Sequence, residues 1–168
     1  MRSKGFDGMV CSVADVLGTV GDRWGLLILR DLLFGLRRYD DLRKSTGVTH
    51  ATLSDRLKSL EENALIERKR YQTRPDRHDY WLTGKGKDVA LVIQALAQVG
   101  DRWNLGGLAG PPLGFVDAKS GRPVRLAPVD AASGAPVRPE DVRLEAGPGA
   151  DELMTWRLET GRAGYTGQ

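Results

Sequence analysis

Apolar residues recur every three or four positions in the first part of the chain, and this spacing predicts two helices. Ser12 is suited to cap the first helix, whose apolar stripe consists of Val13, Val16, Leu17 and Val20. The second helix, Trp24–Phe34, has Asp22 as its N-cap and is apolar on nearly every side. A helix of that kind is buried all round, so we expect it at the centre of the core.

A short helix and a longer amphipathic helix are predicted next. The short helix runs from about Tyr39 to Ser45, and Gly47 breaks it. Thr49 is well placed to cap the helix His50–Asn63, which carries leucines on one face at positions 53, 57 and 60. Its opposite face is polar and consists of His50, Thr52, Asp55, Arg56 and Ser59.

From Leu65 the spacing of apolar residues changes to about two, which predicts the strands Leu65–Tyr71 and His78–Thr83. The residues 72–77 between them include Pro75-Asp76, a typical turn pair, and make a basic tip. Thr83 can cap a last long helix, whose stripe to about Asn104 consists of Val89, Val92, Ile93, Leu96, Val99 and Trp103. This order of elements predicts an α+β fold of mainly α content, a winged helix-turn-helix.

The remaining third of the chain forms a separate extension. Gly106-Gly107 and Gly110-Pro111-Pro112 mark its beginning. Residues 116–125 recur as residues 129–138, and each copy joins a Ser-Gly turn to a short extended segment, which predicts two small hairpin-like units. We therefore expect an N-terminal arm at 1–11, a winged-helix domain at 12–105, a β-rich extension at 106–160 and disorder at 161–168.

Charge and composition narrow the class of protein. Residues 1–104 hold 18 Lys and Arg against 14 Asp and Glu, whereas residues 105–168 hold 7 against 8, so a polyanion would bind the first two thirds. The sequence contains no run of about 18 apolar residues, so no membrane-spanning helix is predicted. Asp7 and Asp15 interrupt any secretory signal, and we expect a cytoplasmic protein.

The helix His50–Asn63 has the properties of a DNA-reading helix, because its polar face begins at its N-terminus and its apolar face can dock on other helices. The alternative is a basic surface that only meets solvent. The candidate contacts are Thr49, His50, Thr52 and Arg56 on this helix, Arg37, Arg38, Arg43 and Lys44 before it, and Arg68, Arg70, Arg74 and Arg77 on the hairpin.

Motifs over residues 9–104 resemble the HxlR-type regulators. They are Cys11, Gly21-Asp22-Arg23-Trp24, the segments 27–33, 38–42 and 53–61, Leu65-Ile66-Glu67-Arg68, and the segment 80–86. The resemblance implies a MarR-like winged-helix homodimer that binds operator DNA through an interface of the first and last helices. A two-fold dimer favours an inverted-repeat operator. The implied interface comprises Val13, Val16, Leu17, Val20, Val89, Val92, Ile93, Leu96 and Trp103, although these residues also fit the monomer core.

The signal that such a regulator would sense is left open by the sequence. Some HxlR-type regulators sense oxidants or electrophiles with a cysteine near the first helix, and Cys11 matches that position. Because the chain has one cysteine, a redox switch would need an intersubunit disulfide or a thiol adduct. The alternative role for Cys11 is that of a small buried apolar residue without a sensing function. An unknown small-molecule effector is the other candidate signal, in a pocket near the dimer interface lined by Trp24, Phe34 and Trp103, although aromatics at helical spacing more often belong to a plain core.

Metal binding and catalysis are not expected. In longer relatives the extension resembles a degenerate zinc ribbon, but this chain has no cysteine there and no histidine after His78, so we predict no metal and no cofactor. His50 and His78 are the only histidines, and no phosphate loop, HExxH or GxSxG motif is present. The chain is therefore not expected to be an enzyme. The alternative function is a winged-helix module that binds protein or RNA without specific duplex DNA binding.

Overall fold

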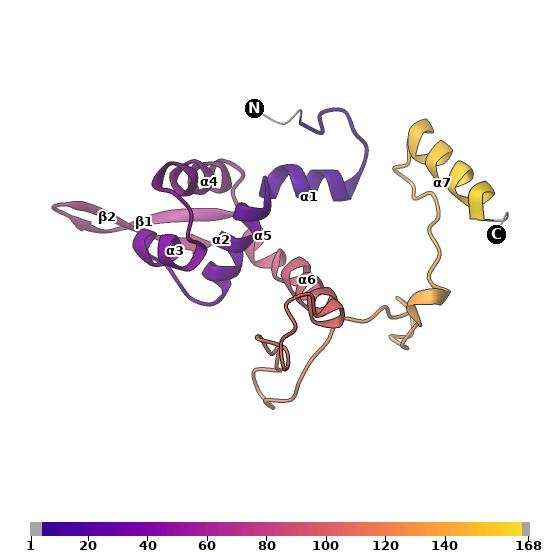
Figure 1. Ribbon diagram of the computed structural model, residues 1–168. Helices are drawn as coiled ribbons and strands as arrows, with labels where there is room; N and C mark the ends of the chain where they lie inside the picture. Colours follow the sequence, from indigo (N-terminus) through magenta and orange to yellow (C-terminus); the bar gives the residue numbers. More distant parts are fainter. Residues whose placement is uncertain (1–4, 166–168) are drawn as a thin grey trace. The chain divides into compact units, whose positions relative to one another are not determined.

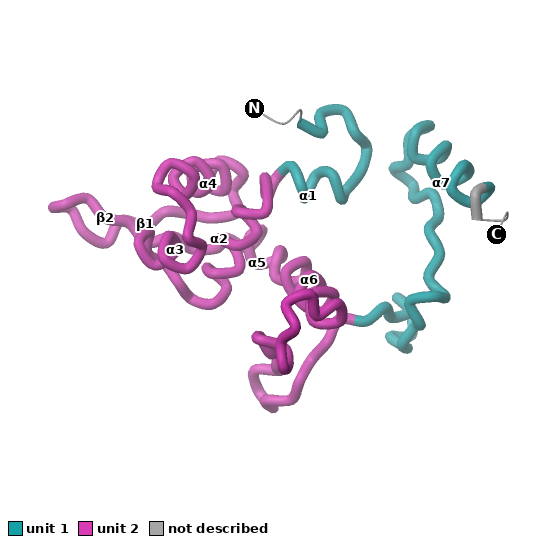
Figure 2. The backbone as a smooth tube through the Cα atoms, viewed as in Figure 1, with its two compact units in different colours: residues 1–18, 127–168 teal, residues 19–126 magenta. Residues whose placement is uncertain are grey.

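The computed structural model describes residues 5–165, so residues 1–4 of the expected arm and 166–168 of the expected disordered end lie outside it (Figure 1). Two compact units are present, one of residues 19–126 and one that joins the residues up to 18 with those from 127 onward (Figure 2). The division differs from the expected boundary after residue 105. Residues 106–126 stay with the winged helix, because the Gln98 amide donates to the Leu126 carbonyl at 3.1 Å and accepts from its N–H.

Four helices precede the hairpin, as the apolar spacing predicts. They are α1 (Ser12–Val20), α2 (Arg23–Leu33), α3 (Tyr39–Thr46) and α4 (His50–Glu62). Two expected caps are confirmed: the Asp22 carboxylate accepts from two backbone N–H groups at the start of α2, at 3.0 and 3.1 Å, and Thr49 Oγ1 accepts from the backbone of Thr52 at 3.2 Å. Gly47 ends α3 in the left-handed conformation.

The hairpin is the wing, and its strands β1 (Ile66–Thr73) and β2 (Asp76–Leu82) pair antiparallel (Figure 1). Both strands are longer than the sequence predicts, so the connection is the dipeptide Arg74-Pro75 instead of residues 72–77. The ladder continues into this polar tip because backbone pairing does not need apolar side chains. Its register shifts between Arg70 and Gln72.

The predicted last helix is divided into α5 (Gly84–Asp88) and α6 (Ala90–Trp103). Thr83 caps α5 as expected, since its Oγ1 accepts from the backbone of Gly86 at 3.1 Å. Val89 joins the two helices with helical dihedrals that depart from a regular α-helix. Apolar spacing alone continues through this joint, which is why it predicts one helix.

The core of the winged-helix unit surrounds α2, as its apolar sequence predicts. Ile28, Leu29 and Leu32 of α2 are fully buried, and the three leucines of the apolar face of α4 pack in the same cluster. A close approach closes this core: a Cβ on Gly86 of α5 would collide with the backbone oxygen of Leu65. Only glycine lets α5 approach the start of the wing so closely.

The two repeat copies form tight turns instead of regular strands. Asp117 accepts from the backbone of Lys119 and Ser120, and a single bridge joins Val116 to Pro123. In the second copy Asp130 Oδ1 accepts from the Ser133 hydroxyl at 2.7 Å and from the backbone of Ser133 and Ala132, which lowers the pKa of Asp130. The expected hairpin-like units are therefore reduced to isolated bridges.

The end of the chain contains a helix that the sequence analysis does not predict. After the short 3-10 helix η1 (Pro139–Asp141), α7 spans Glu152–Tyr165 and includes residues 161–165, which were expected to be disordered. Its apolar residues have no clear helical stripe, and Gly161 lies within it, so the spacing gave no signal. Among residues 5–165 no helix is both long and apolar enough to cross a membrane. The same residues bring no three His, Cys, Asp or Glu side chains together in a metal-binding group.

Candidate nucleic-acid interface

The N-terminal end of α4 is exposed while its apolar face is buried. Thr49 and His50 are exposed, and Thr52 is half-buried beside Thr49, with their hydroxyl oxygens 3.0 Å apart. Leu53 and the leucines below it fix the helix on the core. The first turn of α4 therefore presents hydrogen-bonding groups at its free end, as the sequence predicts for a reading helix.

Tyr39, which the sequence analysis does not include among the site residues, lies against this turn. Its hydroxyl is 3.0 Å from the His50 carbonyl oxygen, 3.0 Å from Ser54 Oγ and 3.3 Å from His50 Nδ1. The Tyr39 and His50 rings are stacked, with centroids 5.7 Å apart and planes inclined by 12°. Nothing in the sequence pairs these residues, because they are brought together only by the turn between α3 and α4.

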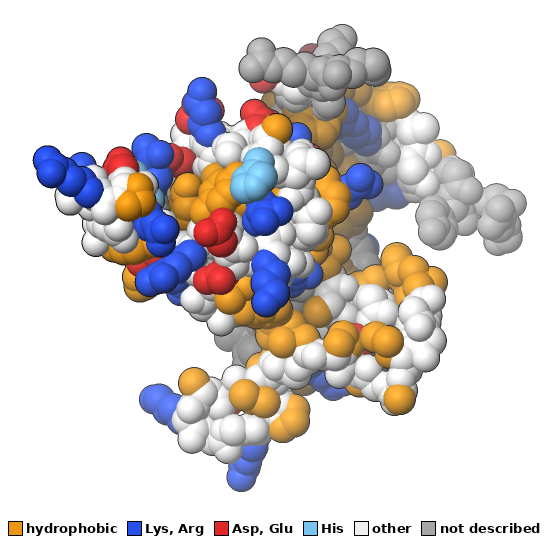
Figure 3. All heavy atoms as spheres, turned by 60° about the vertical axis from the view of Figure 1, so that its left-hand side comes forward, with side chains coloured by type: hydrophobic (Ala, Val, Ile, Leu, Met, Phe, Trp, Pro, Cys, Tyr) orange, Lys and Arg blue, Asp and Glu red, His pale blue; other side chains and the backbone are white. Residues whose placement is uncertain are grey.

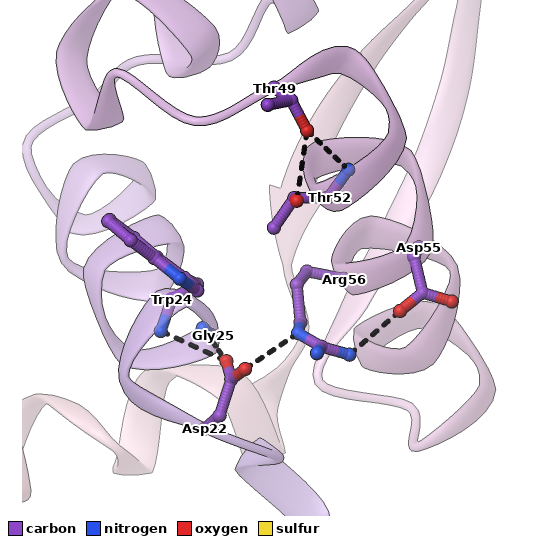
Figure 4. A network of polar contacts seen from close by, with 7 residues as sticks. All are labelled: Asp22, Trp24, Gly25, Thr49, Thr52, Asp55 and Arg56. Carbon is purple, nitrogen blue, oxygen red and sulfur yellow. Dashed lines mark hydrogen bonds and ion pairs between the residues drawn. The ribbon is translucent and has the colours of Figure 1, made fainter. Parts of the chain in front are cut away.

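Arg56, which the sequence predicts to contact DNA, is half-buried and engaged by two carboxylates of its own chain (Figure 4). Its Nε donates to Asp22 Oδ2 at 2.9 Å and its Nη1 donates to Asp55 Oδ2 at 2.8 Å. The other carboxylate oxygen of Asp22 caps α2, so one carboxylate joins the start of α2 to the reading helix. In this chain Arg56 therefore fixes α4 on α2.

The two arginines between α2 and α3 differ in their surroundings. The Arg37 guanidinium donates to the backbone oxygens of Leu32 and, at 2.9 Å, Leu36, and it lies 4.8 Å from the centroid of the Trp81 ring. Arg37 thus connects the end of α2 to the wing instead of projecting into solvent. The Arg38 side chain is 60% exposed and its guanidinium lies 4.9 Å from the Tyr71 ring centroid, so it can reach a partner.

The remaining candidate cations are exposed on the last turn of α3 and on the wing (Figure 3). Figure 3 shows Lys and Arg side chains around this face and at the tip of the wing, with a few carboxylates among them. Two of the wing arginines make loose pairs, Arg68 with Glu61 at 3.7 Å and Arg70 with Asp76 at 3.9 Å. Exposed pairs of this length contribute about 0–1 kcal/mol, so a phosphate can replace the carboxylate. The cations are Arg43, Lys44, Arg68, Arg70, Arg74 and Arg77.

The stripes assigned to dimerisation are divided between core and surface. Val20, Val89 and Ile93 are buried in the core of their own chain, which agrees with the alternative that the stripes complete the monomer. The others are large apolar side chains between 37% and 67% exposed: Val13, Val16, Leu17, Val92, Leu96 and Trp103. Leu91 and Val99 are exposed on α6 as well. An apolar helix face of this extent is typical of a protein interface.

The residues proposed to sense a signal are not gathered in one place. Cys11 is partly accessible just before α1. Phe34 lines a hollow of about 650 Å³ between the end of α2, the end of α6 and residues 105–113. Neither Trp24 nor Trp103 lines that hollow, and a pocket formed by all three aromatic residues near a dimer interface stays a prediction.

Comparison with known proteins identifies a family with this architecture. The family model of the HxlR-like helix-turn-helix matches residues 19–106, which is more than half of the chain. The HTH-type transcriptional regulator Rv3095 of Mycobacterium tuberculosis is 44% identical over 102 residues, which are 61% of this chain and 64% of that protein. The chain thus spans slightly less than two thirds of this relative's length. YtfH of Escherichia coli, also an HTH-type transcriptional regulator, is 38% identical over 88 residues, 52% of this chain and 70% of its own.

Two solved structures are similar over more of the chain, and both proteins are described as candidate transcription factors. PA1374 of Pseudomonas aeruginosa is 39% identical with a TM-score of 0.60, over 88% of this chain and all of that one. PA1607 is 30% identical with a TM-score of 0.73, over 86% of this chain and all of that one. Since residues 19–106 alone are about half of the chain, these similarities include much of the extension. The chain belongs to the HxlR-like helix-turn-helix family of transcriptional regulators.

Proposed function

We propose that this chain is a homodimeric, sequence-specific DNA-binding transcription regulator that acts in the cytoplasm on an inverted-repeat operator. The observation that carries the proposal is the exposed first turn of α4, with Thr49 and His50 at its free end and exposed cations of α3 and the wing around it. The α4 turn supplies groups for base edges in the major groove, and the cations supply contacts to phosphates. The relatives are named as transcriptional regulators, and we propose no catalytic activity.

The exposed apolar residues of α1 and α6 support the dimer. A partner chain on α6 would cover the side chains of Val92, Leu96 and Trp103, which are exposed in the single chain. In a two-fold dimer, two reading helices that lie about 34–36 Å apart would meet successive major grooves of the DNA. Analytical ultracentrifugation tests this: Leu96→Asp is expected to give a monomer. The control Leu144→Asp makes the same change at an exposed leucine outside α1 and α6, and is expected to remain a dimer. A monomeric wild type would refute the proposal.

DNA binding is tested with a duplex from upstream of the chain's own gene against a scrambled duplex of equal length. We expect saturable binding that prefers the upstream duplex. If the dimer meets six to ten phosphates, affinity falls about 10³–10⁵-fold between roughly 50 and 200 mM salt. Lys44→Ala is expected to weaken binding and to reduce the salt slope by about 0.9 for each phosphate that the variant no longer neutralises.

Lys119→Ala is the matched control for this experiment, because it removes the same exposed charge from the first repeat copy and is expected to leave affinity unchanged. Equal affinity for the upstream and scrambled duplexes would count against a specific regulator. In that case the alternative, a winged-helix module that binds protein or RNA, becomes the better account.

A response of the regulator to oxidants or electrophiles is part of the proposal and concerns Cys11. The thiol is partly accessible and immediately precedes α1, so modification there would add bulk or a crosslink at the start of that helix. Operator binding is measured with and without diamide for the wild type and for Cys11→Ser. We expect the reagent to change only the wild type, and equal responses of the two proteins would exclude a redox role.

A further inference from the structure

The Tyr39 hydroxyl has three neighbours at the start of the reading helix and only one proton to give. The His50 carbonyl oxygen, 3.0 Å away, can only accept, whereas the Ser54 hydroxyl, also 3.0 Å away, can donate. When the phenol proton goes to the carbonyl, the Tyr39 oxygen is left to accept from its other two neighbours. A hydrogen bond at the 3.3 Å contact with His50 Nδ1 then requires the proton to be on that nitrogen.

This arrangement favours the tautomer of His50 that has its proton on Nδ1. A neutral imidazole with its proton on Nδ1 presents Nε2 as a hydrogen-bond acceptor. His50 is exposed, and within the described residues no hydrogen bond engages its Nε2. The near-parallel Tyr39 ring also restricts rotation of the imidazole. The reading helix therefore carries an oriented acceptor at its first residue.

We propose that Tyr39 is a positioning residue for base recognition: it holds His50 as the Nδ1–H tautomer, so that Nε2 accepts from an exocyclic amine in the major groove. Those amines are N6 of adenine and N4 of cytosine. Guanine O6 and thymine O4 are themselves acceptors, so the same nitrogen disfavours them at that position. This inference rests on the proposed function, and Tyr39 itself does not contact the base.

The tautomer is measured in the free protein, without DNA. The chain has only two histidines, so ¹⁵N NMR of the histidine-labelled full chain at pH 8.0, with His78→Asn for assignment, reports on the His50 ring directly. We expect a protonated Nδ1 and an unprotonated Nε2 in the wild type. Tyr39→Phe keeps the ring and removes the hydroxyl, and is expected to redistribute the proton toward Nε2. Tyr71→Phe, on the wing, is the matched control and leaves the His50 signals unchanged.

Base preference is measured by selection from randomised duplexes. The wild type and Tyr71→Phe are expected to select adenine or cytosine at one pair of symmetry-related positions. Tyr39→Phe and His50→Ala lose about five- to tenfold of that preference, while preferences at the other positions persist. A wild-type His50 protonated on Nε2, or an unchanged preference in Tyr39→Phe, overturns this inference and leaves the proposed function intact. Absence of any selection by the wild type removes the proposed function, and this inference with it.

Discussion

Asp22 is expected to contribute to stability in two separable ways, because its carboxylate caps α2 and also pairs with Arg56 of α4 (Figure 4). Removal of an N-cap costs about 1 kcal/mol and up to about 2. The ion pair joins side chains that are 31% and 36% exposed, so solvent screens it and about 0.2–1 kcal/mol is expected. Asp22→Ala should therefore lower the free energy of unfolding by about 1–3 kcal/mol.

Asp22→Ser separates the two contributions. Serine is a good N-cap but carries no charge, so this variant should lose only the pair, about 0.2–1 kcal/mol. Urea unfolding followed by circular dichroism at one fixed protein concentration measures both, since any dimer makes stability concentration-dependent. With a slope of about 2 kcal/mol per M, the Asp22→Ala midpoint falls by roughly 0.5–1.5 M.

Two results would refute the reasoning. If Asp22→Ser is as unstable as Asp22→Ala, the cap contributes nothing. If Asp22→Ala costs the same free energy in the wild type and in an Arg56→Leu background, the two side chains are not coupled. In the second case Arg56 would be free to contact DNA, as the sequence analysis supposes.

Three further predictions follow from particular contacts. Gly86→Ala should lower the free energy of unfolding by more than about 2 kcal/mol because its Cβ meets backbone, whereas the control Gly84→Ala, with open space around it, should be nearly neutral in the same urea assay. Burial raises the pKa of Tyr80 above 10.0, so the folded state favours the neutral phenol, and stability present below pH 10 is lost as the pH rises through the folded pKa. The free energy of unfolding should therefore fall less steeply above pH 9 in Tyr80→Phe than in the wild type. Equal declines in the two proteins would contradict this prediction. Gln98→Ala removes both hydrogen bonds to Leu126, about 1 kcal/mol each, and should speed tryptic cleavage within residues 105–126; an unchanged rate would show that other contacts hold that segment.

The sequence located candidate DNA-contacting residues, but the fold decides which of their side chains are free to reach DNA. Thr49 and His50 lie at the exposed end of α4 because cap chemistry and leucine spacing are local and fix both the start and the outer face of the helix. Arg56 lies on the same outer face in the sequence pattern, yet Asp22, 34 residues earlier, holds it. A helical wheel contains no information on which carboxylate of another helix lies opposite an arginine.

The sequence alone determined the order and kind of the elements from α1 to α6, apart from the joint at Val89, and with them the winged helix-turn-helix and the family. The order and kind of the elements follow from spacing, caps and glycines, which act over one or two helical turns, whereas the family follows from the motifs over residues 9–104. The tertiary structure alone decided the length of the wing strands, the place of residues 106–126, the helix α7, and the contact of Tyr39 with His50. The strand length depends on backbone pairing across the hairpin, the place of residues 106–126 on the hydrogen bonds of Gln98 with Leu126, and the Tyr39 contact on the turn between α3 and α4. The spacing of apolar residues encodes none of these contacts, and in α7 it shows no stripe.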